Sequence, residues 1–142
     1  MAIAQAVCNS FKQQILEGQH QFQTGGKVFK LSLYTSAANL SASTTVYTST
    51  NEVANTGQYT AGGGTLTGQQ TSLDTGVAIV DFADLSFTGV TLTAAGALIY
   101  NTSSANKAVC VLDFGGDKTA TAGTFTIVFP AFTSANAILR IS

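Results

Sequence analysis

Apolar residues in the first part of the chain recur every four positions. Residues 2–17 contain neither Gly nor Pro, and four apolar residues share this spacing: Ile3, Val7, Phe11 and Ile15. A stripe at this interval is typical of an amphipathic helix that buries one face. The pattern therefore predicts a helix over residues 2–17, with Gly18 as its stop signal.

From residue 28 onward the pattern changes to alternation and short apolar runs. Residues 28–35 place Phe29, Leu31 and Leu33 on one side and Lys30, Ser32 and Tyr34 on the other, which predicts a strand with one solvent-exposed face. Further strand-like runs follow, separated by turn residues that include Gly115-Gly116-Asp117 and Thr121-Ala122-Gly123: 65–73, 77–82, 85–93, 96–101, 108–114, 124–129 and 137–141. Residues 36–50 show neither period and are expected to form a surface excursion.

This succession of short strands predicts a mainly β fold. No segment between the strands is long and periodic enough to be a crossover helix, so a parallel α/β sheet is disfavoured. We expect one domain spanning residues 1–142, with the helix at 2–17 and a β-rich part at 28–141. The predicted architecture is an antiparallel β-sandwich or a jelly-roll-like barrel with one N-terminal amphipathic helix.

A glycine-rich stretch, residues 51–67, separates the first strand from the later ones. It holds four of the fourteen glycines, and Gly62-Gly63-Gly64 should form a tight loop or bulge that leads into the next strand.

Composition narrows the range of partners. Charged residues make up only 9% of the 142 residues and the formal net charge is −1, so Ser, Thr, Asn, Gln and Gly must supply most of the polar surface. Without a basic cluster, the counterion release that drives nucleic-acid binding is missing, and no nucleic-acid partner is expected. Neither a signal peptide nor an apolar run long enough to span a membrane is recognisable, which predicts synthesis in the cytoplasm and no membrane partner.

Candidate chemistry is sparse. His20 is the only histidine and is expected to be a solvated loop residue; no G-x-S-x-G elbow accompanies it, although a Ser-His-Asp triad can be assembled from distant positions. The pairs Asp81/Asp84 and Asp113/Asp117 do not match a calcium loop, and we expect them to satisfy turn backbone groups. We therefore predict no catalytic, cofactor-binding or metal-ligating residues, and no enzymatic activity.

The cysteines and aromatic residues are assigned mainly to the interior. Cys8 and Cys110 lack CxxC spacing and are expected to be reduced and buried, with a disulfide between them as the alternative. Six phenylalanines on predicted strands are assigned to the core: Phe29, Phe82, Phe87, Phe114, Phe125 and Phe129. Tyr47, Tyr59 and Tyr100 lie next to polar loop residues and are the candidate interface residues.

Several motifs, in order along nearly the whole chain, resemble small virion structural proteins of tailed bacteriophages. They are K-V-F-K-L-S-L-Y-T-S (27–36), T-N-E-V-A-N-T-G-Q-Y-T-A-G-G-G-T-L (50–66), D-F-A-D-L-S-F (81–87), G-A-L-I-Y-N (96–101), K-A-V-C-V-L-D-F-G-G-D-K (107–118) and G-T-F-T-I-V-F-P (123–130). Gln58 departs from the more usual G-Y-T-A-G-G spacing. The resemblance implies a virion component without catalytic residues.

Three functions are compatible with this resemblance and composition. The first is a capsid decoration (cement) protein that binds the assembled head, contacts the major capsid protein and, as a homo-oligomer, stabilises capsomer contacts. The second is a tail, baseplate or fibre-associated protein; a receptor-binding protein of this kind would bind a host receptor or glycan through a concave aromatic-lined site. The third is a hydrolase acting during entry or lysis. Such an enzyme requires a polar catalytic cluster, which the single His and the seven scattered carboxylates scarcely provide.

Overall fold

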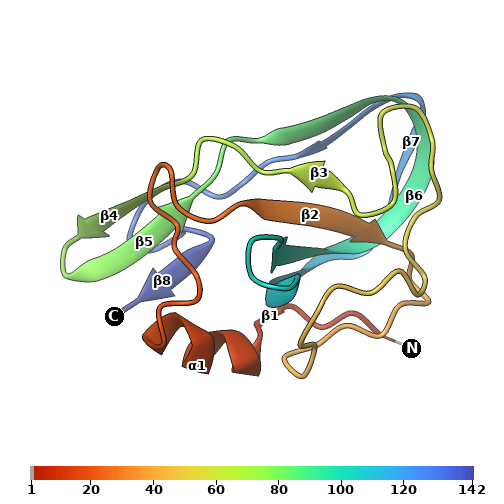
Figure 1. The fold of residues 1–142 in the computed structure, drawn as a ribbon. Coiled ribbons are helices and arrows are strands. Elements are labelled where there is room, and N and C mark those ends of the chain that lie inside the picture. Colours follow the sequence, from red (N-terminus) through yellow and green to blue (C-terminus); the bar gives the residue numbers. More distant parts are fainter. Residues whose placement is uncertain (1) are drawn as a thin grey trace.

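The computed structural model describes residues 2–142 and is mainly β, with two antiparallel sheets and one short helix in a β-sandwich-like arrangement (Figure 1). The larger sheet has the strand order β1-β7-β6-β2-β3, and the smaller one has the order β4-β5-β8. The elements are β1 (Ala6–Val7), α1 (Asn9–Leu16), β2 (Phe29–Tyr34), β3 (Gly64–Thr65), β4 (Gln70–Asp74), β5 (Val77–Asp81), β6 (Leu85–Asn101), β7 (Lys107–Ile127) and β8 (Leu139–Ile141). The predicted fold class is confirmed.

The predicted helix over residues 2–17 is wrong in its first half. Ile3 forms a bridge with Leu40, and β1 pairs with β7 through Ala6↔Val111 and Val7↔Cys110. These residues are extended because Leu40 and the edge of β7 offer them backbone partners, which apolar spacing alone does not reveal. The helix proper covers Asn9–Leu16, and Gly18 follows it with a positive φ of 74°, as its expected stop signal requires.

Strands β6 and β7 form one long ribbon that bends over the molecule (Figure 1). The runs 85–93 and 96–101, predicted as separate strands, are both part of β6, and 108–114 and 124–129 are both part of β7. The Gly115-Gly116-Asp117 and Thr121-Ala122-Gly123 segments are therefore not turns between strands. They lie at irregularities where the β6–β7 register shifts, and Gly115, Gly116 and Ala122 there have positive φ.

The predicted strand over residues 65–73 is divided between the two sheets. Thr65 ends β3 in the larger sheet, and β4 begins at Gln70 in the smaller one. Between them Gly68 has a φ of 63°, a conformation that redirects the chain. The expected loop at Gly62-Gly63-Gly64 is present and leads directly into β3, while the excursion over 36–50 contains only isolated bridges and turns.

Strand β2 lies between β6 and β3 and is buried on both faces. The prediction of one solvent-exposed face is wrong, because Ser32 and Tyr34 are buried and Lys30 is partly buried. The segment from Tyr47 to Gly62 covers that face, as the contacts of its tyrosines show below.

The core is rich in phenylalanine. The ring of Phe29 stacks on that of Phe22 with centroids 4.4 Å apart, and both rings meet Phe82 edge-on. Core placement is confirmed for five predicted phenylalanines, while Phe114 is only partly buried and packs against the core.

Candidate functional site

The glycine-rich stretch is held by a carboxylate that the sequence analysis did not single out. Glu52 Oε1 accepts a hydrogen bond from the Tyr47 hydroxyl at 2.5 Å. Its Oε2 accepts from the Tyr59 hydroxyl at 2.7 Å and from the Gly62 N–H at 2.6 Å. The signal in the sequence is that Glu52 is the one acidic residue between Glu17 and Asp74.

The other two tyrosines extend this network, so that all four tyrosines take part. Tyr34 donates to the Thr48 carbonyl at 2.6 Å, and Tyr100 donates to the Gly62 carbonyl at 2.5 Å. The rings of Tyr47 and Tyr100 pack with centroids 4.8 Å apart. We call Glu52 with these four tyrosines the tyrosine cluster; it fastens residues 47–62 onto β2 and β6.

Burial removes most of this cluster from contact with a partner. Of the three candidate interface residues, Tyr59 is 0% exposed and Tyr100 is 3% exposed, while Tyr47 is partly buried. The Tyr59 hydroxyl also accepts the Leu33 N–H at 2.8 Å, which makes it part of the sheet's hydrogen bonding. Neither Tyr59 nor Tyr100 offers appreciable surface for an interface.

The tyrosine hydroxyls remain protonated near neutral pH. Burial raises the pKa of Tyr100 to about 12, with the Glu52 charge adding to the effect. Burial, followed by the hydrogen bond to Glu52, raises the pKa of Tyr59 and of Tyr47 well above the usual value. As donors to a carboxylate and a carbonyl, these groups are suited to locking the loop rather than to proton transfer.

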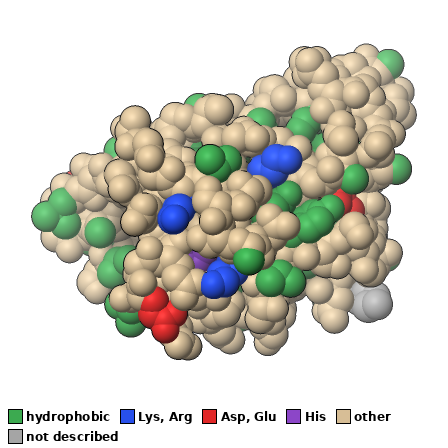
Figure 2. Space-filling model, in the orientation of Figure 1, with side chains coloured by type: hydrophobic (Ala, Val, Ile, Leu, Met, Phe, Trp, Pro, Cys, Tyr) green, Lys and Arg blue, Asp and Glu red, His purple; other side chains and the backbone are tan. Residues whose placement is uncertain are grey.

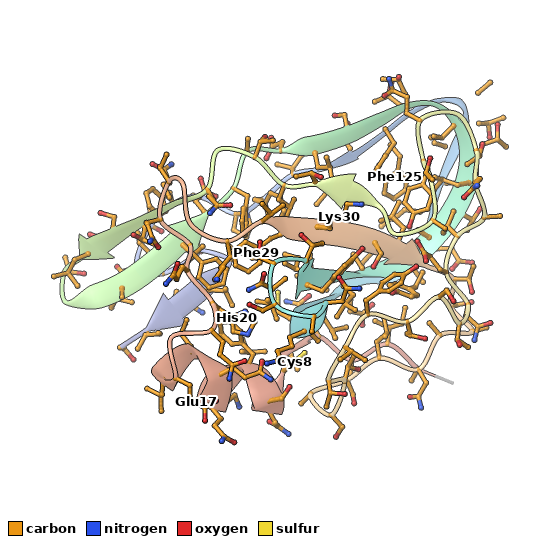
Figure 3. The ribbon with its side chains drawn as sticks, in the orientation of Figure 1. Cys8, Glu17, His20, Phe29, Lys30 and Phe125 are labelled. Atoms are coloured by element: carbon orange, nitrogen blue, oxygen red, sulfur yellow. The ribbon has the colours of Figure 1, made fainter. Side chains whose placement is uncertain are left out.

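His20 is buried and not the solvated loop residue that was predicted. It is 3% exposed and lies between α1 and the β2 region (Figure 3). Its Nε2 lies 2.9 Å from Gln14 Oε1 and its Nδ1 lies 3.0 Å from Asn101 Nδ2, so Nε2 donates and Nδ1 accepts in a neutral ring. Burial, with a smaller contribution from the Lys107 charge, lowers the pKa of His20 to about 4.

The cysteines and aspartates are held in structural environments. Cys8 and Cys110 are free and buried, as predicted, and burial raises the pKa of Cys8 to about 11. Asp113 Oδ1 accepts the Gly115 N–H at 2.9 Å and Asp84 Oδ1 accepts the Phe129 N–H at 3.0 Å, which confirms for these two the predicted role in satisfying backbone groups. Among residues 2–142 there is no group of three or more His, Cys, Asp or Glu side chains placed to hold a metal ion.

Two of the surface hollows have apolar side chains in their lining. One of about 490 Å³ lies beside the end of β7, with aromatic, amide and charged side chains in its lining that include Phe114, Phe125, Phe129, Asp113 and Lys118. The other, of about 540 Å³, is a mainly apolar groove between α1 and the smaller sheet, lined in part by Ile15, Leu16, Val80 and Ile141.

The β6–β7 ribbon carries an exposed set of uncharged hydroxyl groups. Cross-strand pairs join Ser86 to Thr126 at 2.9 Å and Thr93 to Thr119 at 3.0 Å between side-chain oxygens. The exposed Ser and Thr residues of the ribbon include Ser86, Thr88, Thr91, Thr93, Thr119, Thr121, Thr124 and Thr126. Charged side chains are also scattered and few on the face drawn in Figure 2.

The described part of the chain, residues 2–142, has no helix with the length and apolar character needed to cross a membrane. Comparison with protein-family models, with curated proteins and with solved structures finds no match to this chain.

Proposed function

We propose that this chain is a non-enzymatic structural protein of a bacteriophage virion, and specifically a decoration (cement) protein. It binds the outside of the assembled head, contacts the major capsid protein and stabilises the junctions between capsomers. Two features support this proposal: the motifs that resemble small virion proteins and the hydroxyl-rich surface of the β6–β7 ribbon, whose exposed charged side chains are Asp113, Asp117 and Lys118.

The ribbon is the observation that carries the proposal. Hydroxyl groups can exchange water for a partner's backbone groups without the large desolvation cost of a buried charge. The Ser86–Thr126 and Thr93–Thr119 pairs hold their side chains across the two strands, which limits the conformational entropy lost on docking. Such a surface suits binding at many equivalent sites, where each copy contributes a modest share of the total stabilisation.

The state of the reactive side chains supports a non-catalytic role. The ring nitrogens of His20 are engaged by Gln14 and Asn101, and burial keeps the Cys8 thiol protonated near neutral pH. The Glu52 carboxylate is occupied by three donors within the tyrosine cluster.

Binding to isolated heads that lack the protein tests the proposal. Wild-type protein should sediment with the heads, and Thr88→Lys/Thr119→Lys should bind at least about tenfold more weakly, because two ammonium groups would have to lose their water at the contact. The matched control Ser43→Lys/Thr45→Lys adds the same charge at exposed positions outside the ribbon and should bind like wild type. Gold-labelled antibody should decorate the heads of intact particles. Label confined to tails, or equal weakening by both double variants, contradicts the proposal.

One observation favours the second candidate, a tail, baseplate or fibre-associated protein that binds a receptor. The hollow beside β7 combines the rings of Phe114, Phe125 and Phe129 with Gln5, Asp113 and Lys118, which is the concave aromatic site that glycan binding would require. Labelling of tails, together with loss of host adsorption in a phage carrying Lys118→Ala, would favour this function over head decoration.

A further inference from the structure

Among residues 2–142, strand β4 is the longest of the four strands that lie at the ends of the two sheets. The larger sheet ends in β1 and β3, which have two residues each, whereas the smaller sheet ends in β8 with three residues and β4 with five. The first four residues of β4 are exposed, and Leu73 is 73% exposed. In Figure 1 the β4–β5 hairpin projects from one end of the molecule.

The turn of this hairpin determines which backbone groups of β4 are free. Thr75 and Gly76 form a two-residue connection with φ of 49° and 85°, and Asp74 pairs with Val77 beside it. Because such a turn closes on a hydrogen-bonded pair and pairs alternate along an antiparallel ladder, Asp74, Ser72 and Gln70 direct their backbone groups toward β5. Thr71 and Leu73 therefore direct their N–H and C=O groups away from the sheet.

Nothing in β4 protects this edge. The strand contains no Lys, no Pro and no register shift, the features that usually block pairing between exposed edges. The neighbouring loop hydrogen-bonds to the residue before the strand, where Gln69 Nε2 donates to the Gln23 and Lys27 carbonyls at 3.0 and 2.9 Å. The free groups of Thr71 and Leu73 are thus open to another strand.

We propose that β4 pairs antiparallel with β4 of a second copy of this chain, across a two-fold axis at Ser72. Thr71 then lies opposite Leu73 of the second copy, and each such pair exchanges two backbone hydrogen bonds. The result is a continuous six-stranded sheet built from the two smaller sheets, an isologous interface that closes as a dimer.

Charge favours this occupant and this register. Asp74 is the one charged residue of β4, and the Ser72-centred register places it opposite the neutral amide of Gln70 rather than opposite another Asp74. Asp74 Oδ2 already accepts the Ser134 N–H at 2.6 Å, which leaves Oδ1 to accept from that amide. No like charges face each other along the paired strands.

The exposed Leu73 side chain gains a cross-strand neighbour in this dimer, whereas Ile141 lies on β8 at the opposite edge of the smaller sheet. Cross-strand pairing places Leu73 beside Ala78 and Ala78 beside Ile141, on the face that lines the apolar groove. Leu73 and Ile141, 73% and 60% exposed, are two of the most exposed large apolar side chains in the structure. The two-fold axis brings both copies' Leu73 side chains onto the same face, so that each packs near Thr71 of the other copy. The inference rests on this edge alone and does not depend on capsid binding.

Sedimentation velocity of the purified chain over a concentration series tests the dimer. Thr71→Pro removes an outward N–H from each copy and should weaken dimerisation at least about tenfold, because two backbone bonds are lost. The control Thr71→Val keeps that N–H and should dimerise like wild type. Far-UV circular dichroism establishes that the variants remain folded.

A charge-pair experiment tests the register and remains decisive if Thr71→Pro does not fold. Ser72→Lys and Ser72→Glu each place like charges opposite one another, and each alone should dimerise about threefold to fivefold more weakly than wild type at low salt. An equimolar mixture of the two should recover the dimer as a heterodimer. A wild-type chain that stays monomeric throughout, or that pairs through this edge only with another protein, overturns the proposal. Unchanged dimerisation of both Ser72 variants also overturns it.

Discussion

At the scale of single residues, two polar side chains contribute to the fold through the hydrogen bonds that they make. Glu52 gathers two tyrosine hydroxyls and the Gly62 N–H, and His20 joins the helix to β6 through Gln14 and Asn101. His20 also makes the stability of the protein depend on pH, because its position suits only the neutral ring.

We expect the free energy of unfolding to fall as the pH is lowered from 6.5 to 4. The pKa of His20 is about 4 in the folded protein and near 6.5 when unfolded, so its contribution is full above pH 6.5 and is lost toward pH 4. This difference between the two pKa values corresponds to a loss of about 3 kcal/mol in the free energy of unfolding. Urea denaturation at a series of pH values measures it, with His20→Gln as the control that removes the titrating ring. An identical decline in wild type and His20→Gln would show that other groups cause it.

At the scale of elements, close backbone packing fixes the loop that leads into β3. Gly63 has a φ of 84°, and a Cβ at this position would lie 1.8 Å from the Leu31 carbonyl oxygen of β2. The tyrosine cluster and Gly63 hold the same loop in place, since Tyr100 and Glu52 both hydrogen-bond to the adjacent Gly62.

Alanine substitutions at Gly63 and at Gly25 separate the strain of a positive φ from the steric contact with the backbone of β2. Gly25 has a similar φ of 80° and open space around it. Gly25→Ala should therefore lower the free energy of unfolding by about 1–2 kcal/mol through backbone strain alone. Gly63→Ala adds a collision with β2 backbone and should lower the free energy of unfolding by at least about 1–3 kcal/mol more. Urea denaturation of both variants at neutral pH gives the comparison, and equal losses would mean that the contact with β2 is not constraining.

At the scale of the whole molecule, a phenylalanine core joins the two sheets and the segment after α1. Phe29 comes from β2, Phe82 directly follows β5, and Phe22 lies between α1 and β2. Because Phe29 is 0% exposed and stacks within this group, removing its ring would weaken the packing of both sheets.

Phe29→Ala should lower the free energy of unfolding by about 3–5 kcal/mol, since the cavity lies where the sheets meet. The control Val128→Ala changes a side chain that is 72% exposed and should cost less than about 0.5 kcal/mol. Thermal unfolding followed by circular dichroism reports both. A small loss for Phe29→Ala would contradict its central place in the core.

The predictable parts of this molecule are those specified by local pattern. The strand at β2 and the glycine loop follow from residues that are neighbours in sequence, and the core placement of five phenylalanines follows from the strand-like runs that contain them. The burial of His20, Tyr59 and Tyr100 depends on partners that lie up to about eighty positions away, as the His20–Asn101 contact illustrates. Likewise, the spacing of four predicted a helix that includes Ile3 and Val7, but Ile3 pairs with Leu40 and Val7 pairs with Cys110 of β7, and both are extended.

The pairing of β1 with β7 has a consequence for the order in which the protein can fold. Ala6 has its partner at Val111, so β1 cannot join the sheet until β7 has been synthesised and aligned on β6. Pairings between such distant segments slow folding because the loop between them must close first. We expect the larger sheet to remain incompletely folded through most of the synthesis of the chain, with β1 among the last strands to join it.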